Sequence, residues 1–176
     1  MNKEIWTLIG WVVSASILGF FISAVFAGWL RFSRHRFLIP YVSLVSIFIY
    51  FFFILNGLNP VEILTKGWVW GIVLGGLVSI FLVKTVRSQP ATRQSSGIAL
   101  GFDIAWAGLV YGTIDALFLN VMPVIAIWIG TSQFGWATTM IGKIGIALFG
   151  LFASLLVTLA YHLGYPEFRN KSVGLV

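Results

Sequence analysis

The chain has 176 residues, of which 59% are hydrophobic and only 9% are charged, so a soluble globular domain, with about 45–50% apolar and about 25% charged residues, is excluded. It contains no cysteine, which excludes disulfides, thiolate metal sites and cysteine nucleophiles. The net charge of +6 does not indicate nucleic-acid binding, because the basic residues lie beside the ends of apolar runs instead of on one folded face.

Five apolar runs follow one another along the chain, and each predicts a transmembrane helix, since about 20 helical residues cross a bilayer core of ~30 Å. They cover residues 5–30, 37–55, 61–83, 98–130 and 136–163. The third is extended back to residue 61 because Asn59 suits an N-cap and Pro60 a first helical position. We therefore expect an all-α integral membrane protein, a single polytopic domain over residues 1–176 built as a bundle of five transmembrane helices.

The basic residues predict the orientation. Eight of the eleven Lys and Arg residues lie in alternate gaps, and by the positive-inside rule these gaps are cytoplasmic. The N-terminus is then outside and the C-terminus cytoplasmic, and we expect the cytoplasmic membrane of a prokaryote. The eight residues are Arg31, Arg34, Arg36, Lys84, Arg87, Arg93, Arg169 and Lys171.

The first run could instead be a signal peptide, with Val25 and Ala27 before a cleavage point at Gly28. This is disfavoured because the basic end of a signal peptide precedes its apolar core, whereas here the basic cluster follows. The chain ends in a second apolar segment, Val173 to Val176. We expect these residues to dock on the bundle or on a partner, or to begin a further membrane segment; a disordered tail is the alternative.

Small residues at every fourth position predict where helices pack closely, because contact between helices in lipid depends on small side chains. The Phe-rich run 37–55 has no such row and is expected to face lipid or a partner protein. The rows are Ala15, Gly19, Ser23 and Ala27; Gly67, Gly71, Gly75 and Ser79; Gly108, Gly112 and Ala116; and, more weakly, Gly150, Ser154 and Thr158.

The run 98–130 is longer than a bilayer requires, since a straight helix of this length spans ~50 Å. Pro123 removes one backbone hydrogen bond and clashes with the carbonyl of Leu119, which predicts a bend or break between these residues. The segment is either an ordinary kink or the unwound middle of a discontinuous helix that lines a polar site.

Asp115 is the strongest candidate site residue. It follows Gly108 and Gly112 on one helix face, so we expect it to point into the bundle, where an acid is normally paired, protonated or hydrated. The functional hypothesis is an ion or proton site formed by Asp115, Asn120 and Lys143, and the alternative is an acid that only holds helices together. Lys143 can also snorkel outward, and a direct pair with Asp115 requires the helix to be bent.

A second polar group is expected at the cytoplasmic edge of the membrane, and it consists of His35, Asp103, His162, Glu167 and Arg169. Asp103 is expected to complement its own helix N-terminus or to pair with Arg93 or Arg87. No ligand spacing supports a metal, and His and aromatic residues are ordinary anchors at an interface. We therefore predict no metal site and no cofactor.

The sequence contains no H-E-x-x-H, no G-x-S-x-G and no glycine-rich phosphate loop. The favoured hypothesis is a non-catalytic membrane subunit or assembly component of a larger complex, in contact with the lipid bilayer and with copies of itself or other membrane subunits. One alternative is a small oligomeric transporter or channel-like module that uses Asp115 as a proton or cation site. A second alternative is an intramembrane enzyme whose active site matches no known motif.

Overall fold

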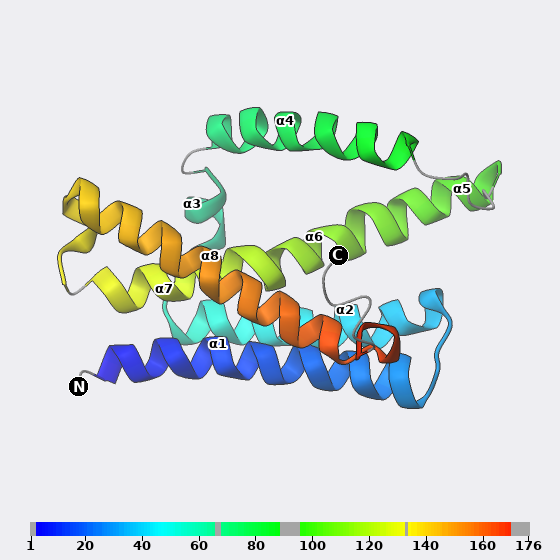
Figure 1. Cartoon of the computed structure of the whole chain (residues 1–176), viewed down its shortest axis with the longest axis horizontal. Coiled ribbons are helices and arrows are strands. Elements are labelled where there is room, and N and C mark those ends of the chain that lie inside the picture. The colour runs from blue at the N-terminus through cyan, green and yellow to red at the C-terminus, as the bar shows by residue number, and fades with distance from the viewer. Residues whose placement is uncertain (1–2, 66–67, 89–95, 133, 170–176) are drawn as a thin grey trace.

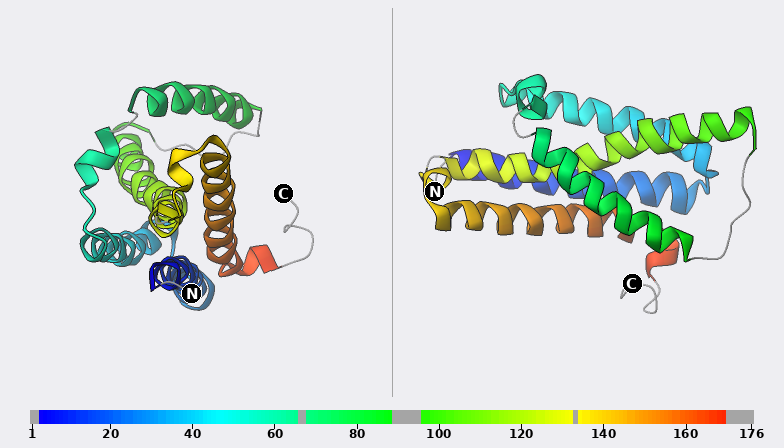
Figure 2. Two further views of the ribbon diagram at one scale, coloured as in Figure 1. Left: turned by 90° about the vertical axis from the view of Figure 1, so that its left-hand side faces the viewer. Right: turned by 90° about the horizontal axis from the view of Figure 1, so that it is seen from above.

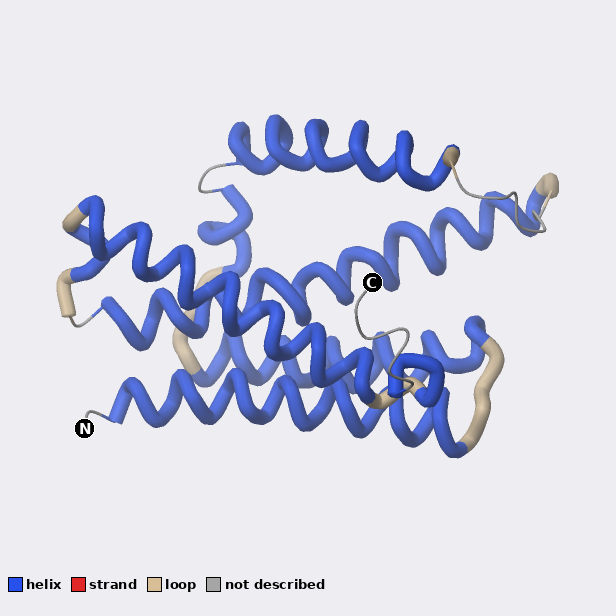
Figure 3. The backbone as a smooth tube through the Cα atoms, viewed as in Figure 1, coloured by secondary structure: helices blue, strands red, loops and turns tan. Residues whose placement is uncertain are grey.

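The computed structural model describes residues 3–65, 68–88, 96–132 and 134–169, which form helices joined by short connections; no strand occurs in these residues (Figures 1 and 3). Four of the helices are long and apolar enough to cross a membrane. The protein is therefore all-helical and has the composition of a membrane-embedded bundle. The four helices are Ile5–Trp29, Arg34–Leu55, Ile98–Ser132 and Met140–Leu163.

Two of the four long helices change hydrogen-bonding pattern along their length. The first consists of α1 (Lys3–Ile22) and the π-helical η1 (Ser23–Trp29). The second is α2 (Arg34–Leu55) and the last is α8 (Met140–Leu163), with η4 (Trp136–Thr138) before it and η5 (Pro166–Arg169) after it. Helix 98–132 comprises α5 (Ile98–Asp103), η2 (Ile104–Val110), α6 (Tyr111–Ala116), η3 (Leu117–Val121) and α7 (Met122–Ser132).

The region of the third apolar run contains two helices. Asn59 caps the first of them, because its Oδ1 accepts hydrogen bonds from the N–H groups of Val61 at 3.0 Å and Glu62 at 3.4 Å. That helix, α3 (Pro60–Thr65), is short and runs in a different direction from α4 (Trp68–Arg87) (Figure 1). Every side chain of α4 that the structure describes is exposed, and α4 lies beside the bundle without packing closely on it (Figure 2).

The core forms where α1, α2, helix 98–132 and α8 run alongside one another. One end of this bundle holds the loop after η1, the start of α2 and the end of α8; we call it the basic end, because Arg31, Arg34 and Arg36 lie there. The opposite end holds the start of α1, α3 and the connection between α7 and α8. The largest fully buried side chains are Tyr41, Phe52, Phe118, Leu38 and Met122.

Helix α1 packs on α8 through its row of small residues. Ala15 and Ser23 are fully buried, and a Cβ placed on Gly19 would lie 3.3 Å from the Cβ of Tyr161. The Ser23 hydroxyl donates to the carbonyl of Tyr161 at 2.6 Å, which ties the two helices together where the basic end begins. The two segments lie so close there that a Cβ on Gly164 would overlap the Ser23 hydroxyl.

Of the other predicted rows, the one with Gly150 and Ser154 also packs closely, since a Cβ on Gly150 would lie 3.3 Å from Val124 and Ser154 is buried, whereas the rows on helix 98–132 and α4 do not. A Cβ added to Gly108 or Gly112 would meet no heavy atom within 4 Å, and the same is true of Gly71 and Gly75 on α4. The prediction that the Phe-rich helix faces lipid or a partner is incomplete, because Phe52 is fully buried whereas the adjacent Phe51 is exposed. Helix α2 therefore contributes one face to the core and turns the other outward.

The chain remains helical through Leu119 and Pro123, with no unwound residue between them. Instead, the π-helical segment η3 ends immediately before α7. Proline has no N–H to donate to the carbonyl four residues earlier, which is that of Leu119. Ser154 of α8 donates to this carbonyl at 2.7 Å and so supplies a hydrogen bond across the helix interface. The predicted docking of Val173 to Val176 lies outside the described residues.

Candidate functional site

The most unusual polar contact in the bundle joins Tyr41 of α2 to Asp115 of α6. The Tyr41 hydroxyl donates to Asp115 Oδ1 at 2.6 Å, and Tyr41 is fully buried while Asp115 is half-buried. Tyr41 belongs to the buried stripe of α2, in which Val45 and Ile49 follow at successive fourth positions. The same packing that builds the core therefore aims a phenol at the acid.

Three further tyrosines continue from this pair toward the basic end. Tyr111 lies one turn before Asp115 on α6. Its hydroxyl lies 3.3 Å from that of Tyr161, which in turn lies 2.6 Å from the hydroxyl of Tyr165. The rings pack on one another as well, with centroids of Tyr41 and Tyr111 5.2 Å apart. We call Tyr41, Tyr111, Tyr161 and Tyr165 the tyrosine cluster.

The tyrosine cluster reaches a pocket of about 270 Å³ at the basic end. Tyr111 and Tyr165 line this pocket together with Arg34 and Glu167, so it carries one charge of each sign. Burial raises the pKa of the Tyr165 phenol above its ordinary value, although its hydrogen bond with Tyr161 acts in the opposite direction. Tyr165 is therefore neutral at physiological pH and can both donate and accept a hydrogen bond.

Arg34, the first residue of α2, also lines a second pocket, of about 360 Å³. His35 and Asp103 meet here, with His35 Nε2 3.7 Å from Asp103 Oδ1. Both side chains are accessible, so this contact is a surface ion pair when the histidine is protonated, and such pairs contribute little to stability. Arg93, one predicted partner of Asp103, lies outside the described residues, and so does the side chain of Arg87.

The remaining members of the predicted cytoplasmic cluster are spread over the same end of the bundle. The His162 ring donates from Nδ1 to the carbonyl of Thr158 at 2.8 Å and packs edge-on against Phe168, with centroids 5.0 Å apart. Glu167 lines the pocket that contains Tyr165. Arg169 ends η5, and its side chain lies outside the described part of the chain. The structure thus brings His35 to Asp103 and places Glu167 and Arg34 on the walls of one pocket, while His162 bonds to its own helix.

Asn120 and Lys143 do not join Asp115. Asn120 Oδ1 accepts from Ser154 at 3.0 Å, one and a half turns farther along helix 98–132. Two contacts show which residues of α8 and helix 98–132 lie at the same level: a Cβ on Gly150 would meet Val124, and Ser154 bonds to Asn120. Continued along the two helices, this pairing places the exposed Lys143 level with about residue 131. Lys143 therefore lies about 24 Å from Asp115 along the helix axis.

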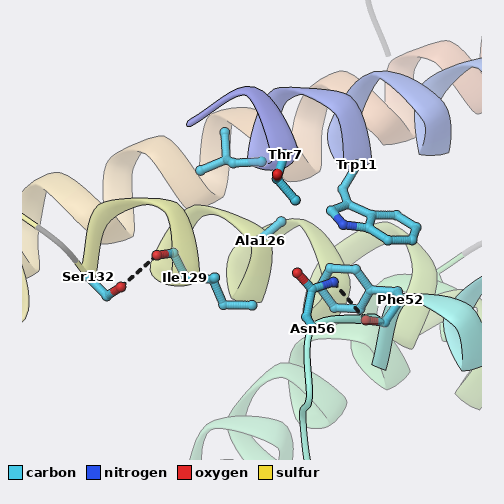
Figure 4. A pocket seen from close by; sticks show the side chains of 8 residues that line it. Thr7, Trp11, Phe52, Asn56, Ala126, Ile129 and Ser132 are labelled. Carbon is cyan, nitrogen blue, oxygen red and sulfur yellow. Dashed lines mark hydrogen bonds between the residues drawn. The ribbon is translucent and has the colours of Figure 1, made fainter. Parts of the chain in front are cut away.

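The pocket at the opposite end of the bundle does not include Asp115 in its walls. This pocket, of about 130 Å³, is lined by Thr7, Trp11, Asn56 and Ser132, among others (Figure 4). Asn56 donates to the carbonyl of Phe52 at 2.8 Å and Ser132 to that of Ile129 at 2.7 Å, so both side chains bond within their own segments. Between this pocket and Asp115 lie side chains of the apolar core: Phe118, Leu119, Met122 and Ile125.

Tyr41 and Tyr111 are the site residues that sequence reasoning missed. A signal was present, because a tyrosine inside an apolar helix needs a partner for its hydroxyl.

Within the described residues every buried side-chain nitrogen or oxygen atom has a hydrogen-bond partner, and no three His, Asp or Glu residues gather into a group that could hold a metal ion. Comparison of the chain with protein-family models, with curated proteins and with solved structures finds no match.

Proposed function

We propose that the chain crosses a prokaryotic cytoplasmic membrane five times, with its N-terminus outside and the basic end in the cytoplasm. Helix α4, with 20 residues, is about 30 Å long and matches the hydrocarbon thickness. A fifth crossing brings all three basic segments to one side, in agreement with the positive-inside rule. Helix 98–132 is longer than a crossing requires, and we propose that it bends at the junction of η3 and α7.

The orientation predicts which positions react with a membrane-impermeant thiol reagent added to intact cells. The chain has no cysteine, so each substitution supplies a single thiol. Thr138→Cys, at the end opposite the basic end, should be labelled from outside, whereas Ser33→Cys should be labelled only after the cells are opened. Labelling of Ser33→Cys in intact cells would reverse the proposed orientation.

Within the membrane, the best-supported function is that of a non-catalytic subunit that packs against a partner through α4. This proposal depends on one observation: α4 is an apolar helix that stands apart from the bundle. A helix inside a finished membrane protein usually packs closely on its neighbours through small residues. Gly71, Gly75 and Ser79 form such a row on α4, and no heavy atom lies near the positions of the missing glycine Cβ atoms.

The experiment is to isolate the protein in mild detergent and to measure the mass of the complex. We expect a complex larger than the 19.5 kDa chain with its detergent, and we expect Gly75→Leu to release the partner by blocking the close approach of a second helix. Gly76→Leu is the matched control, because it makes the same change about 100° around the same helix. A monomeric wild-type protein, or equal effects of the two variants, would contradict the proposal.

A second candidate function, the binding or passage of protons at Asp115, is favoured by the tyrosine cluster. A row of neighbouring hydroxyl groups can pass a proton along hydrogen bonds. The tyrosine cluster lies between the basic-end pocket and Asp115. An acid in the middle of a membrane helix is more often functional than structural. The two proposals differ in whether Asp115 has to titrate, and the substitution of this residue by asparagine distinguishes them.

A further inference from the structure

The pocket of about 270 Å³ at the basic end is lined mainly by aromatic side chains. We call it the basic-end pocket. Its charged residues are Arg34 and Glu167, one of each sign. The aromatic residues in its walls are Phe32, Phe37, Tyr111 and Tyr165.

The four rings come from segments that are far apart in the chain. Phe32 and Phe37 lie beside and within the first turn of α2, Tyr111 begins α6, and Tyr165 follows α8. The rings of Phe37 and Tyr165 pack on each other with centroids 5.8 Å apart, which holds two of these segments together. Phe37 is buried whereas Phe32 is 37% exposed, so the rings extend from the core to the surface. Aromatic rings attract cations, and the attraction is stronger where water is excluded, so these walls suit a cationic group.

The two charged side chains indicate a ligand that carries both signs of charge. Arg34 would repel a bare cation, and Glu167 would repel a bare anion. The ion pairs of the described residues do not join Arg34 to Glu167, so a ligand in the pocket can contact both. A zwitterion satisfies both contacts, because its anionic oxygens can bond to the guanidinium group while its cationic group lies near the carboxylate and the rings.

The walls favour a quaternary over a primary ammonium group. A primary ammonium group has three N–H donors, and its transfer from water costs free energy unless each donor finds an acceptor. The hydroxyl groups of Tyr111 and Tyr165 already form hydrogen bonds with Tyr161, at 3.3 and 2.6 Å. A quaternary ammonium group has no donor to satisfy, and it is the cation that sites built from aromatic rings bind.

We propose that the basic-end pocket binds a zwitterion whose quaternary ammonium group lies near the aromatic rings and Glu167 and whose carboxylate or phosphate oxygens bond to Arg34. The pocket lies at the membrane edge, since Arg34 begins one of the helices able to cross a membrane. This chemistry occurs in small soluble betaines and in the head of phosphatidylcholine, and both can reach the membrane edge. Binding at equilibrium requires neither proton passage through the tyrosine cluster nor a partner at α4, so the inference does not depend on the functions proposed above.

The first test is the binding of glycine betaine to the purified full-length protein, measured by isothermal titration calorimetry in a maltoside detergent, whose head is uncharged. Glycine and choline are the comparison ligands, because glycine has a primary ammonium group in place of the quaternary one and choline has no anionic group. We expect glycine betaine to bind about tenfold more tightly than either. Binding of glycine or choline as tight as that of glycine betaine would overturn the proposal.

Matched variants separate the two contacts. Arg34→Gln should weaken the binding of glycine betaine about tenfold without weakening that of choline, whereas Arg36→Gln makes the same change of charge outside the pocket and should have no effect. Phe32→Leu removes one ring and should weaken binding about threefold, while Phe32→Tyr keeps the ring and should retain it. All three positions are exposed, so the core is not disturbed, and an unchanged elution profile checks this. Equal effects of Arg34→Gln and Arg36→Gln would show that the anionic group does not bind in this pocket.

The two sources of the ligand are distinguished with phosphatidylcholine, phosphatidylethanolamine and phosphatidylglycerol that have identical acyl chains. Each lipid is added to the same preparation, and retained lipid is measured by native mass spectrometry. If free glycine betaine does not bind, about tenfold better retention of phosphatidylcholine that Arg34→Gln and Phe32→Leu reduce would assign the pocket to the lipid head. Failure of both glycine betaine and phosphatidylcholine to bind would overturn the proposal.

Discussion

Substitution of Gly164 by alanine should lower the free energy of unfolding by about 1–3 kcal/mol, the usual cost of overpacking a tight contact. The backbone of Gly164 has φ −66° and ψ −29°, so alanine can adopt its conformation without strain. The added Cβ would, however, overlap the Ser23 hydroxyl and lie 2.6 Å from the carbonyl oxygen of Phe20. The end of α8 must then move away from α1, which also lengthens the hydrogen bond from Ser23 to Tyr161.

Gly10→Ala is the matched control for this substitution. Gly10 lies on the exposed side of α1, and no heavy atom lies within 4 Å of the position of its missing Cβ. The higher helix propensity of alanine should therefore leave the stability unchanged or raise it by about 0.5 kcal/mol. Both values are measured by reversible unfolding in mixed micelles with increasing SDS. Equal effects of the two substitutions would mean that α1 and α8 do not approach as closely as described.

Removal of the Asp115 carboxyl group should cost about 1–2 kcal/mol, because Asp115→Ala leaves the fully buried Tyr41 hydroxyl without its acceptor. Asp115→Asn keeps an oxygen acceptor at the same place and should cost less than about 1 kcal/mol. Tyr41→Phe combined with Asp115→Ala should cost less than the sum of the single changes, since each change removes the same hydrogen bond. Additive effects in the SDS titration would show that the pair contributes nothing to stability.

The same variants decide the role of the acid. In vesicles with an imposed pH gradient, a proton pathway through Asp115 predicts that Asp115→Asn abolishes proton flux while the folded protein is retained. A structural acid predicts that flux is absent in the wild type as well and that only Asp115→Ala weakens the assembly. The tyrosine cluster supplies a second check, because Tyr111 lines the basic-end pocket one turn before Asp115, so Tyr111→Phe removes the hydroxyl group between the pocket and the acid.

The positions of the long helices could be predicted from the sequence because an apolar run of sufficient length has no other stable form in a membrane. The partner of Asp115 could not, since Tyr41 lies 74 residues away and only the packing of two helices brings the side chains together. Local signals did identify the cap at Asn59 and the polar carbonyl that Pro123 leaves at Leu119. The donor that satisfies this carbonyl, Ser154, again comes from a distant helix.

The close packing predicted at Gly108 and Gly112 is wrong for a specific physical reason. It assumed a regular period of 3.6 residues, but the π-helical turns of η2 interrupt helix 98–132 and shift this phase before Asp115, which does point into the bundle. The predicted runs end at residue 130 and resume at residue 136. Helix 98–132 instead continues to Ser132 and α8 does not begin until Met140, which moves Lys143 farther from Asp115.

The contact between α1 and α8 also determines when the bundle can be completed during synthesis. The hydrogen bond from Ser23 to Tyr161 spans 138 residues, so the first helix meets its main partner only after the last helix has left the ribosome. Until then the surface of the first helix that carries Gly19 of α1 and Ser23 of η1 faces lipid or the insertion machinery. Membrane helices insert first and associate afterwards, so the bundle should close in a late step that a ribosome stalled before α8 cannot reach.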